Sequence, residues 1–185
     1  MKTILKMGGY LMLVITLACS SSKNTATPEE VAALDQMISD QKFEIKANWA
    51  QPMATQSLNS IANAGLLPPG STVSRIDVSS SRGFLRMKGD SIMADLPFFG
   101  ERRMGGYYNQ NNTGIKFEGV PEDLSFTPIK KGQGQTMRFN INQDTEGYQV
   151  IAQLYPNGTA RLMVASNYRT NIWYQGNLSK FKEEE

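Results

Sequence analysis

The chain has 185 residues, with 19 Lys+Arg against 17 Asp+Glu, a single cysteine and no histidine. Without histidine the protein cannot form a Ser-His-Asp triad, an imidazole metal site or a histidine pH switch. One cysteine excludes an internal disulfide, and the length fits one domain.

The N-terminal residues have the features of an export signal. Lys2 and Lys6 precede an uncharged, mostly apolar run at residues 7–18. A membrane-spanning helix needs about 20 apolar residues, so this run is too short to span and instead matches a cleaved signal peptide. We therefore predict a signal peptide at residues 1–18, ending directly before Cys19.

Residues 16–19, Thr-Leu-Ala-Cys, resemble the lipobox of bacterial lipoproteins. The resemblance implies that Cys19 receives a diacylglycerol and then a further acyl chain of the palmitate type. Two or more chains anchor a protein stably. We expect a lipidated tether at residues 19–26 and an outer-membrane location in the cell envelope. If Cys19 is incidental, the protein is instead soluble in the periplasm.

Loss of the signal peptide changes the charge of the protein. Residues 1–18 contain two lysines and no acidic residue, which leaves 17 Lys+Arg (19 less 2) against 17 Asp+Glu. Nucleic-acid binding needs a basic face or stripe. A neutral domain argues against it, and we exclude nucleic acid as a partner.

A helix is predicted directly after the tether. Thr27, Pro28 and Glu30 occupy the N-cap, first-turn and capping-box positions. Apolar residues then recur at three- and four-residue steps, which predicts an amphipathic helix of about fourteen residues.

From Lys42 the period changes to two, as in a half-buried strand. The pattern predicts that Phe43, Ile45, Ala47 and Trp49 lie on one buried side. A short helical turn is expected near residues 58–62, and nine later runs read as strands joined by hairpin turns. These runs are residues 73–79, 84–88, 91–96, 114–120, 124–130, 135–142, 148–154, 159–165 and 171–178.

Strands with one apolar face need that face covered, by closure of the sheet or by a second layer. We predict a mainly β fold, an antiparallel meander that forms a sandwich or an incomplete barrel, with an N-terminal amphipathic helix. The β-rich domain is expected at residues 27–181, followed by a frayed tail at 182–185.

Four segments resemble those of a known family. They are residues 89–92 (GDSI), 96–100 (LPFFG), 114–117 (GIKF) and 166–176, which begins Ser-Asn-Tyr-Arg. On these segments the chain is similar to the domain-of-unknown-function family 4251, lipoproteins from anaerobic Gram-negative bacteria. The resemblance extends over most of the chain from Phe43 onward. It implies a β-rich exported lipoprotein and assigns no catalytic residue.

The loop after residue 96 combines aromatic, basic and glycine residues. Tyrosine suits a sugar ring, and arginine pairs with carboxylate or phosphate. The alternative is structural, with Pro97 ending an edge strand while Phe98 and Phe99 cap the core. The candidate ligand-binding residues of this loop are Arg102, Arg103, Tyr107 and Tyr108.

Trp173 is a further candidate ligand-binding residue. Adjacent strand residues point to opposite faces, so Trp173 faces outward if Ile172, Tyr174 and Leu178 face inward. Such an outer surface, with Asn171, Gln175 and Asn177, suits a carbohydrate or a protein partner. The alternative is that the N-terminal helix covers Trp173.

Catalysis would depend on carboxylates, and no pair of them is singled out by spacing or by an apolar setting. No metal or cofactor motif is present either. The scattered carboxylates are Asp77, Asp90, Asp95, Glu101, Glu118, Glu122, Asp123, Asp144 and Glu146.

Asp90, Ser91 and Ile92 resemble a short bacterial acceptor for O-glycans, which makes Ser91 a candidate modification site. Taken together, the sequence predicts a non-catalytic envelope lipoprotein that binds an envelope protein or glycan. The alternatives are a carboxylate-based glycan hydrolase and a carrier of a lipid or small hydrophobic ligand.

Overall fold

The computed structural model of the chain describes residues 26–103, 114–129 and 133–181. Within these residues all strand pairings are antiparallel. The strands are β1 (Lys42–Pro52), β2 (Ile76–Asp77), β3 (Phe84–Lys88), β4 (Ser91–Leu96), β5 (Ile115–Gly119), β6 (Glu122–Pro128), β7 (Gln135–Gln143), β8 (Glu146–Leu154), β9 (Thr159–Ser166) and β10 (Ile172–Lys180).

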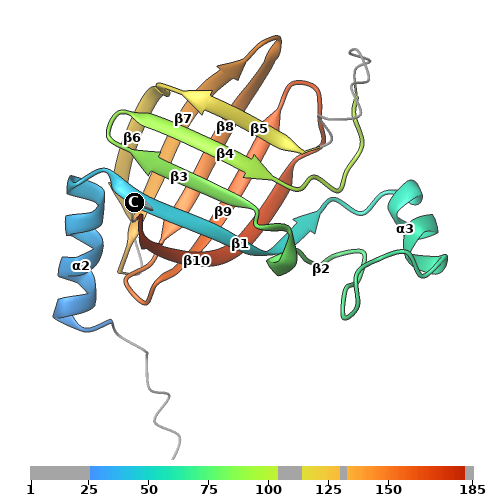
Figure 1. The fold of residues 1–185 in the computed structure, drawn as a ribbon, viewed down its shortest axis with the longest axis horizontal. Helices are drawn as coiled ribbons and strands as arrows, with labels where there is room; N and C mark the ends of the chain where they lie inside the picture. Colours follow the sequence, from blue (N-terminus) through green and yellow to red (C-terminus); the bar gives the residue numbers. More distant parts are fainter. Residues whose placement is uncertain (1–25, 104–113, 130–132, 182–185) are drawn as a thin grey trace, which may run out of the picture.

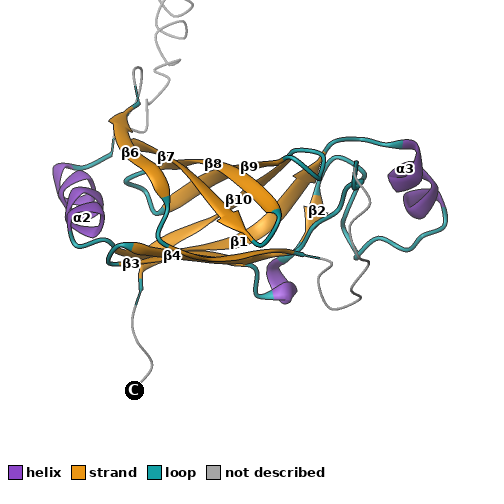
Figure 2. Ribbon diagram, turned by 90° about the horizontal axis from the view of Figure 1, so that it is seen from above, coloured by secondary structure: helices purple, strands orange, loops and turns teal. Residues whose placement is uncertain are grey.

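The strands form one sheet that curls into a half-barrel (Figure 1). The sheet order is β5-β4-β3-β1-β10-β9-β8-β7-β6, and β2 pairs with β1 off this path. Seen from above, β7, β8 and β9 lie across from β3 and β4 (Figure 2). The edge strands β5 and β6 are not paired with each other within the described residues. The predicted mainly β class is confirmed, and its form is an incomplete barrel.

Apolar side chains fill the inside of the curl. Along β8 the buried residues alternate, from Tyr148 and Val150 to Ala152 and Leu154. Across the interior, the rings of Phe117 on β5 and Phe139 on β7 meet edge to face with centroids 6.2 Å apart. Burial of these side chains supplies the main stabilisation of the fold.

The predicted N-terminal helix is α2 (Pro28–Ser39), twelve residues long. The Thr27 hydroxyl accepts from the backbone N–H of Glu30 at 3.2 Å, and the Glu30 carboxylate accepts from that of Thr27 at 2.8 Å. This is the predicted capping box. Leu34 is buried in the core, and α2 lies at one end of the half-barrel (Figure 1). The short helix α3 (Gln56–Asn63) lies beyond the other end.

A bulge in β1 changes which of its side chains face inward. The register against β10 shifts between Ala47 and Trp49, which adds one residue to β1. Ala50 is therefore buried, whereas Trp49 is only half-buried. The prediction that Trp49 lies on the buried side is wrong, because the bulge reverses the alternation after Ala47.

The strand predicted at residues 73–79 is also wrong in extent. Only Ile76–Asp77 pairs with β1, and a 3₁₀-helix follows at Ser79–Ser81. The Asp77 carboxylate accepts from the backbone N–H of Ser79 at 2.9 Å and turns the chain there. No helix among the described residues has the length and apolar character to cross a bilayer.

Candidate functional site

Trp173 lies on the outer face of the sheet. Its neighbours Ile172 and Tyr174 are buried on the inner face, whereas Trp173 is 41% exposed. The predicted outward orientation is confirmed. The alternative that the N-terminal helix covers Trp173 is wrong, because α2 packs at the end of the half-barrel through Leu34.

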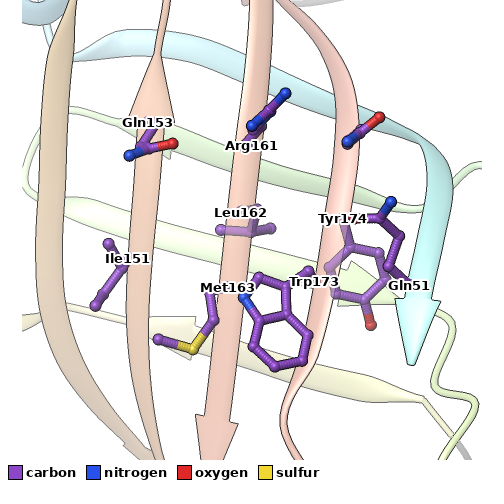
Figure 3. Close-up of a pocket in the computed structure, with 9 residues that line it drawn as sticks. Gln51, Ile151, Gln153, Arg161, Leu162, Met163, Trp173 and Tyr174 are labelled. Carbon is purple, nitrogen blue, oxygen red and sulfur yellow. The ribbon is translucent and has the colours of Figure 1, made fainter. Parts of the chain in front are cut away.

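A shallow groove of about 330 Å³ includes Trp173 and crosses β8, β9, β10 and the end of β1. Figure 3 shows apolar side chains towards one end of the groove and amide and guanidinium groups towards the other. The lining residues are Gln51, Ile151, Gln153, Arg161, Leu162, Met163, Trp173, Tyr174 and Gln175.

The apolar half of the groove is one cross-strand row, which we call the apolar rung. Ile151 on β8 pairs with Met163 on β9, and Met163 pairs with Trp173 on β10. Residues that pair in an antiparallel ladder project from the same face, with Cβ atoms about 5 Å apart. The three side chains therefore form a continuous apolar strip on the outer surface.

The polar half is the next row, which we call the polar rung. Gln153 on β8 pairs with Arg161 on β9, and Arg161 pairs with Gln175 on β10. The hydroxyl of Tyr155 donates to the side-chain oxygen of Gln153 at 3.0 Å and fixes that amide. Arg161 is exposed, and no ion pair or hydrogen bond of its side chain is found within the described residues. Two amides and one cation without an ion-pair partner among the described residues thus lie in a row on the outer face.

Trp49 lies on β1 beside the groove, although it is not one of the lining residues. Gln51 pairs with Trp173, and Trp49 pairs with Gln175, so the two tryptophans are diagonal neighbours at a separation of about 7–8 Å. The guanidinium carbon of Arg75 lies 3.9 Å from the centroid of a Trp49 ring. This cation–π contact covers one face of Trp49 and fixes the indole in place.

Asp77 pairs with Trp49 at the outer side of β1. Hydrogen bonds from the hydroxyl and backbone N–H of Ser79 lower the pKa of Asp77, and the charge of Arg75 adds to the effect. This carboxylate is therefore ionised at neutral pH and has its own partners.

The sequence-predicted residues Arg102 and Arg103 lie elsewhere, at a junction between two loops. Arg102 forms an isolated bridge with Arg169, and its Nη2 lies 3.3 Å from Oε2 of Glu146. The backbone N–H of Arg103 donates to the carbonyl of Tyr168 at 2.7 Å. These contacts favour the structural interpretation of this part of the loop, and neither arginine lines the groove.

Glu146 and Arg169 form a buried ion pair at the same junction. Arg169 Nε donates to Oε1 of Glu146 at 2.8 Å, and the Ser166 hydroxyl donates to the same oxygen. Burial would raise the pKa of Glu146, but the hydrogen bonds from Arg169 and Ser166 and the positive charge of Arg169 outweigh it and lower the pKa. Burial raises the pKa of Tyr148 beside them.

The remainder of this junction closes one end of the barrel. Tyr174 donates its hydroxyl to the carbonyl of Pro97 at 2.8 Å, and Arg169 lies 5.1 Å from the ring of Phe98. Phe98 and Phe99 are partly buried against the core. The chain after β4 therefore caps the core, as the structural interpretation predicts. The same interpretation is wrong that Pro97 follows an edge strand, because β4 pairs with both β3 and β5.

No carboxylate is among the residues that line the groove. Asp95, Glu118 and Asp144 line a separate shallow pocket, where Asp95 is paired with Lys116 at 3.1 Å. Among the described residues, no three acidic or cysteine side chains are grouped so that they could hold a metal ion.

Three predicted site residues lie outside the described residues, namely Cys19, Tyr107 and Tyr108. Ser91 is half-buried at the start of β4, and its hydroxyl donates to Asp90 at 3.1 Å. Glycosylation of Ser91 stays a prediction. Of the outer-face polar residues predicted beside Trp173, Gln175 lines the groove, whereas Asn171 and Asn177 do not.

Sequence reasoning did not single out Trp49, Met163 or Arg161. A signal was present for Met163, because this apolar residue and Ile151 occupy outward positions where an exposed face normally carries polar side chains. For Trp49 there was no such signal, because the bulge cannot be seen in the alternation.

Comparison with known proteins gives the family. Residues 26–178 match the family described as "Domain of unknown function (DUF4251)". A crystal structure of a DUF4251 family protein from Bacteroides eggerthii is similar, with a TM-score of 0.54 and 14% identity, over 82% of this chain and 88% of that one. No curated protein matches the chain. At 14% identity the structural likeness shows the fold alone, but the family match spans most of the chain, which therefore belongs to the DUF4251 family.

Proposed function

We propose that this protein is a non-catalytic cell-envelope lipoprotein, tethered through Cys19, whose outer-face groove binds an envelope glycan or protein. One observation carries the proposal. Both tryptophans of the chain, Trp49 and Trp173, lie as diagonal neighbours on the outside of the sheet and not in the core.

The composition of this surface supports binding. In the apolar rung Trp173 is exposed, and Met163 and Ile151 are half-buried. Contact of apolar groups with water is unfavourable, and contiguous apolar patches of this kind mark interaction sites. The apolar rung lies beside two glutamine amides and Arg161. A mixed surface of this sort suits a ligand with one apolar face and several hydroxyl or amide groups.

Several features argue for a binding protein over the hydrolase alternative. A glycosidase needs a carboxylic acid with a raised pKa opposite a second carboxylate. Glu146 has a lowered pKa and is held by Arg169, and Asp95 is paired with Lys116. The carrier alternative needs space inside the sheet, where residues such as Phe139 and Val150 are packed and buried.

The test incubates the full lipidated chain with detergent-solubilised envelope material and measures which components the protein retains. We compare wild type with Trp173→Ala and with Leu66→Ala, a control that also removes an exposed apolar side chain but lies away from the groove. We expect wild type and Leu66→Ala to retain one defined glycan or protein, and Trp173→Ala to lose it. Equal retention by all three proteins would refute a role for the groove.

A further inference from the structure

We infer that the ligand of the groove is an acidic glycan, whose anionic group is bound by Arg161 while a sugar ring stacks on Trp173. The inference rests on the proposed function and names the class of ligand. It follows from three features of the outer face: its charge, the arrangement of its two rungs, and the position of its strands in the sheet.

The charge of the groove is positive. Arg161 is its one charged lining residue, and it has no ion-pair partner among the described residues. Asp77, which pairs with Trp49 across β1 and β2, does not line the groove, and its carboxylate accepts hydrogen bonds from Ser79. An exposed guanidinium without a carboxylate partner is complementary to an anion, with which it forms charge-assisted hydrogen bonds.

The two rungs are spaced for a ring with one apolar face. They lie two residues apart along β9, about 7 Å. A sugar ring placed on Trp173 would have its C–H face against the indole and its edge groups towards Gln175 and Arg161. The fixed amide of Gln153 offers a further hydrogen-bonding group on the same side.

The position of the strands favours a glycan over an extended peptide. Peptides that bind to sheets commonly pair with the backbone of a free edge strand. Here β8, β9 and β10 are each paired on both sides, so their backbone groups are already satisfied. Recognition must therefore come from side chains on the face of the sheet, as in stacking and hydrogen bonding to sugars.

The experiment measures binding to the full chain by intrinsic fluorescence, because both tryptophans lie on this face. The probes are polygalacturonate and its methyl ester, which have the same backbone with and without charge. Dextran sulfate and dextran form a second matched pair for a sulfate group. Poly-L-glutamate tests whether negative charge alone is sufficient.

We expect at least one acidic polysaccharide to bind about tenfold more tightly than its neutral counterpart, the effect of one charge-assisted contact. Arg161→Gln should remove this preference, and Arg161→Lys should restore part of it. Lys88→Gln is the matched control, since it also removes a positive charge. Lys88 lies away from the groove at the end of β3, opposite Lys42 in the register of β1 and β3. Trp173→Ala should abolish binding of both members of the pair.

Three results would overturn the inference. Equal binding of acidic and neutral polymers would show a neutral-sugar site, and the proposed function would stand. Equal binding of poly-L-glutamate would show that charge alone is recognised. Binding of no polysaccharide would also overturn it, and capture of envelope material that depends on Trp173 would then point to a protein partner. If that capture fails too, the proposed function fails with it.

Discussion

Arg169 donates from Nε to Oε1 of Glu146 at 2.8 Å, and the two side chains are only 1% and 8% exposed. Arg102 contacts the same carboxylate from the other loop, with Nη2 3.3 Å from Oε2. Glu146, at the start of β8, therefore joins the chain after β4 to the chain between β9 and β10. A buried charge of this kind is tolerated because its partner and its hydrogen bonds are in place.

Replacing Glu146 should destabilise the protein strongly. Glu146→Gln removes the carboxylate that neutralises the buried guanidinium of Arg169, and we expect a loss of about 3–5 kcal/mol in the free energy of unfolding. Chemical denaturation followed by circular dichroism measures it. Glu122→Gln, at an exposed position on β6, is the control and should change stability by less than about 0.5 kcal/mol. A Glu146→Gln protein as stable as the control would contradict the structural role of the pair.

Stability should depend on pH through the same carboxyl group. The pKa of Glu146 in the folded protein lies below its ordinary value of 4.5, so the unfolded chain binds the proton more readily. The stabilisation is complete above that ordinary value and is lost as the pH falls through the lowered pKa of the folded state. Denaturant titrations from neutral pH into this acid range should show that the free energy of unfolding falls less with acid in Glu146→Gln than in wild type. Identical pH profiles would argue against it.

Gly176 should tolerate no side chain. It pairs with Ala47 at the bulge, and a Cβ at this position would overlap the carbonyl oxygen of Lys46. Because that oxygen belongs to the backbone, β1 and β10 must separate, and Gly176→Ala should lower the free energy of unfolding by about 3 kcal/mol. Gly147→Ala is the control, since its Cβ would meet only the side chain of Asn142. Equal stabilities would contradict the close approach of the two strands.

The sequence predicted the hairpins well where the pattern is local. The strands at Phe84–Lys88 and Ser91–Leu96 have the predicted bounds, because a two-residue turn fixes their register. It failed at Trp49, where an extra residue in β1 is accommodated only against the register of β10. Of the groove, the sequence predicted Trp173 and its outward-facing neighbour Gln175. The groove's other residues come from four strands that only the curled sheet brings together.

The buried Glu146–Arg169 pair shows a different limit of sequence reasoning. In the sequence, Glu146 could not be distinguished from eight other scattered acidic residues. Its environment comes from segments that lie far apart in the chain. Burial and a specific partner decide the role of such a carboxylate. Neither is visible before the fold is known.

The mass of the native protein tests the anchor and the modification. Protein purified from its own membranes should have a denatured mass equal to residues 19–185 plus acyl chains, and Cys19→Ser should lack them and leave the membrane fraction. A further sugar-sized increment that disappears in Ser91→Ala would support glycosylation at the β3–β4 hairpin. An unlipidated wild-type mass would refute the anchor and favour a soluble periplasmic protein.

The most direct test of the central claim is oxidative footprinting of the full chain with and without envelope polysaccharide. Hydroxyl radicals modify exposed tryptophan and methionine, and Met53, which is 43% exposed and does not line the groove, is an internal control. We expect the polysaccharide to protect Trp173 and Met163 from oxidation and to leave the oxidation of Met53 unchanged. Saturating binding with unchanged oxidation of Trp173 and Met163 would show that the polysaccharide binds elsewhere and that the groove is not its site.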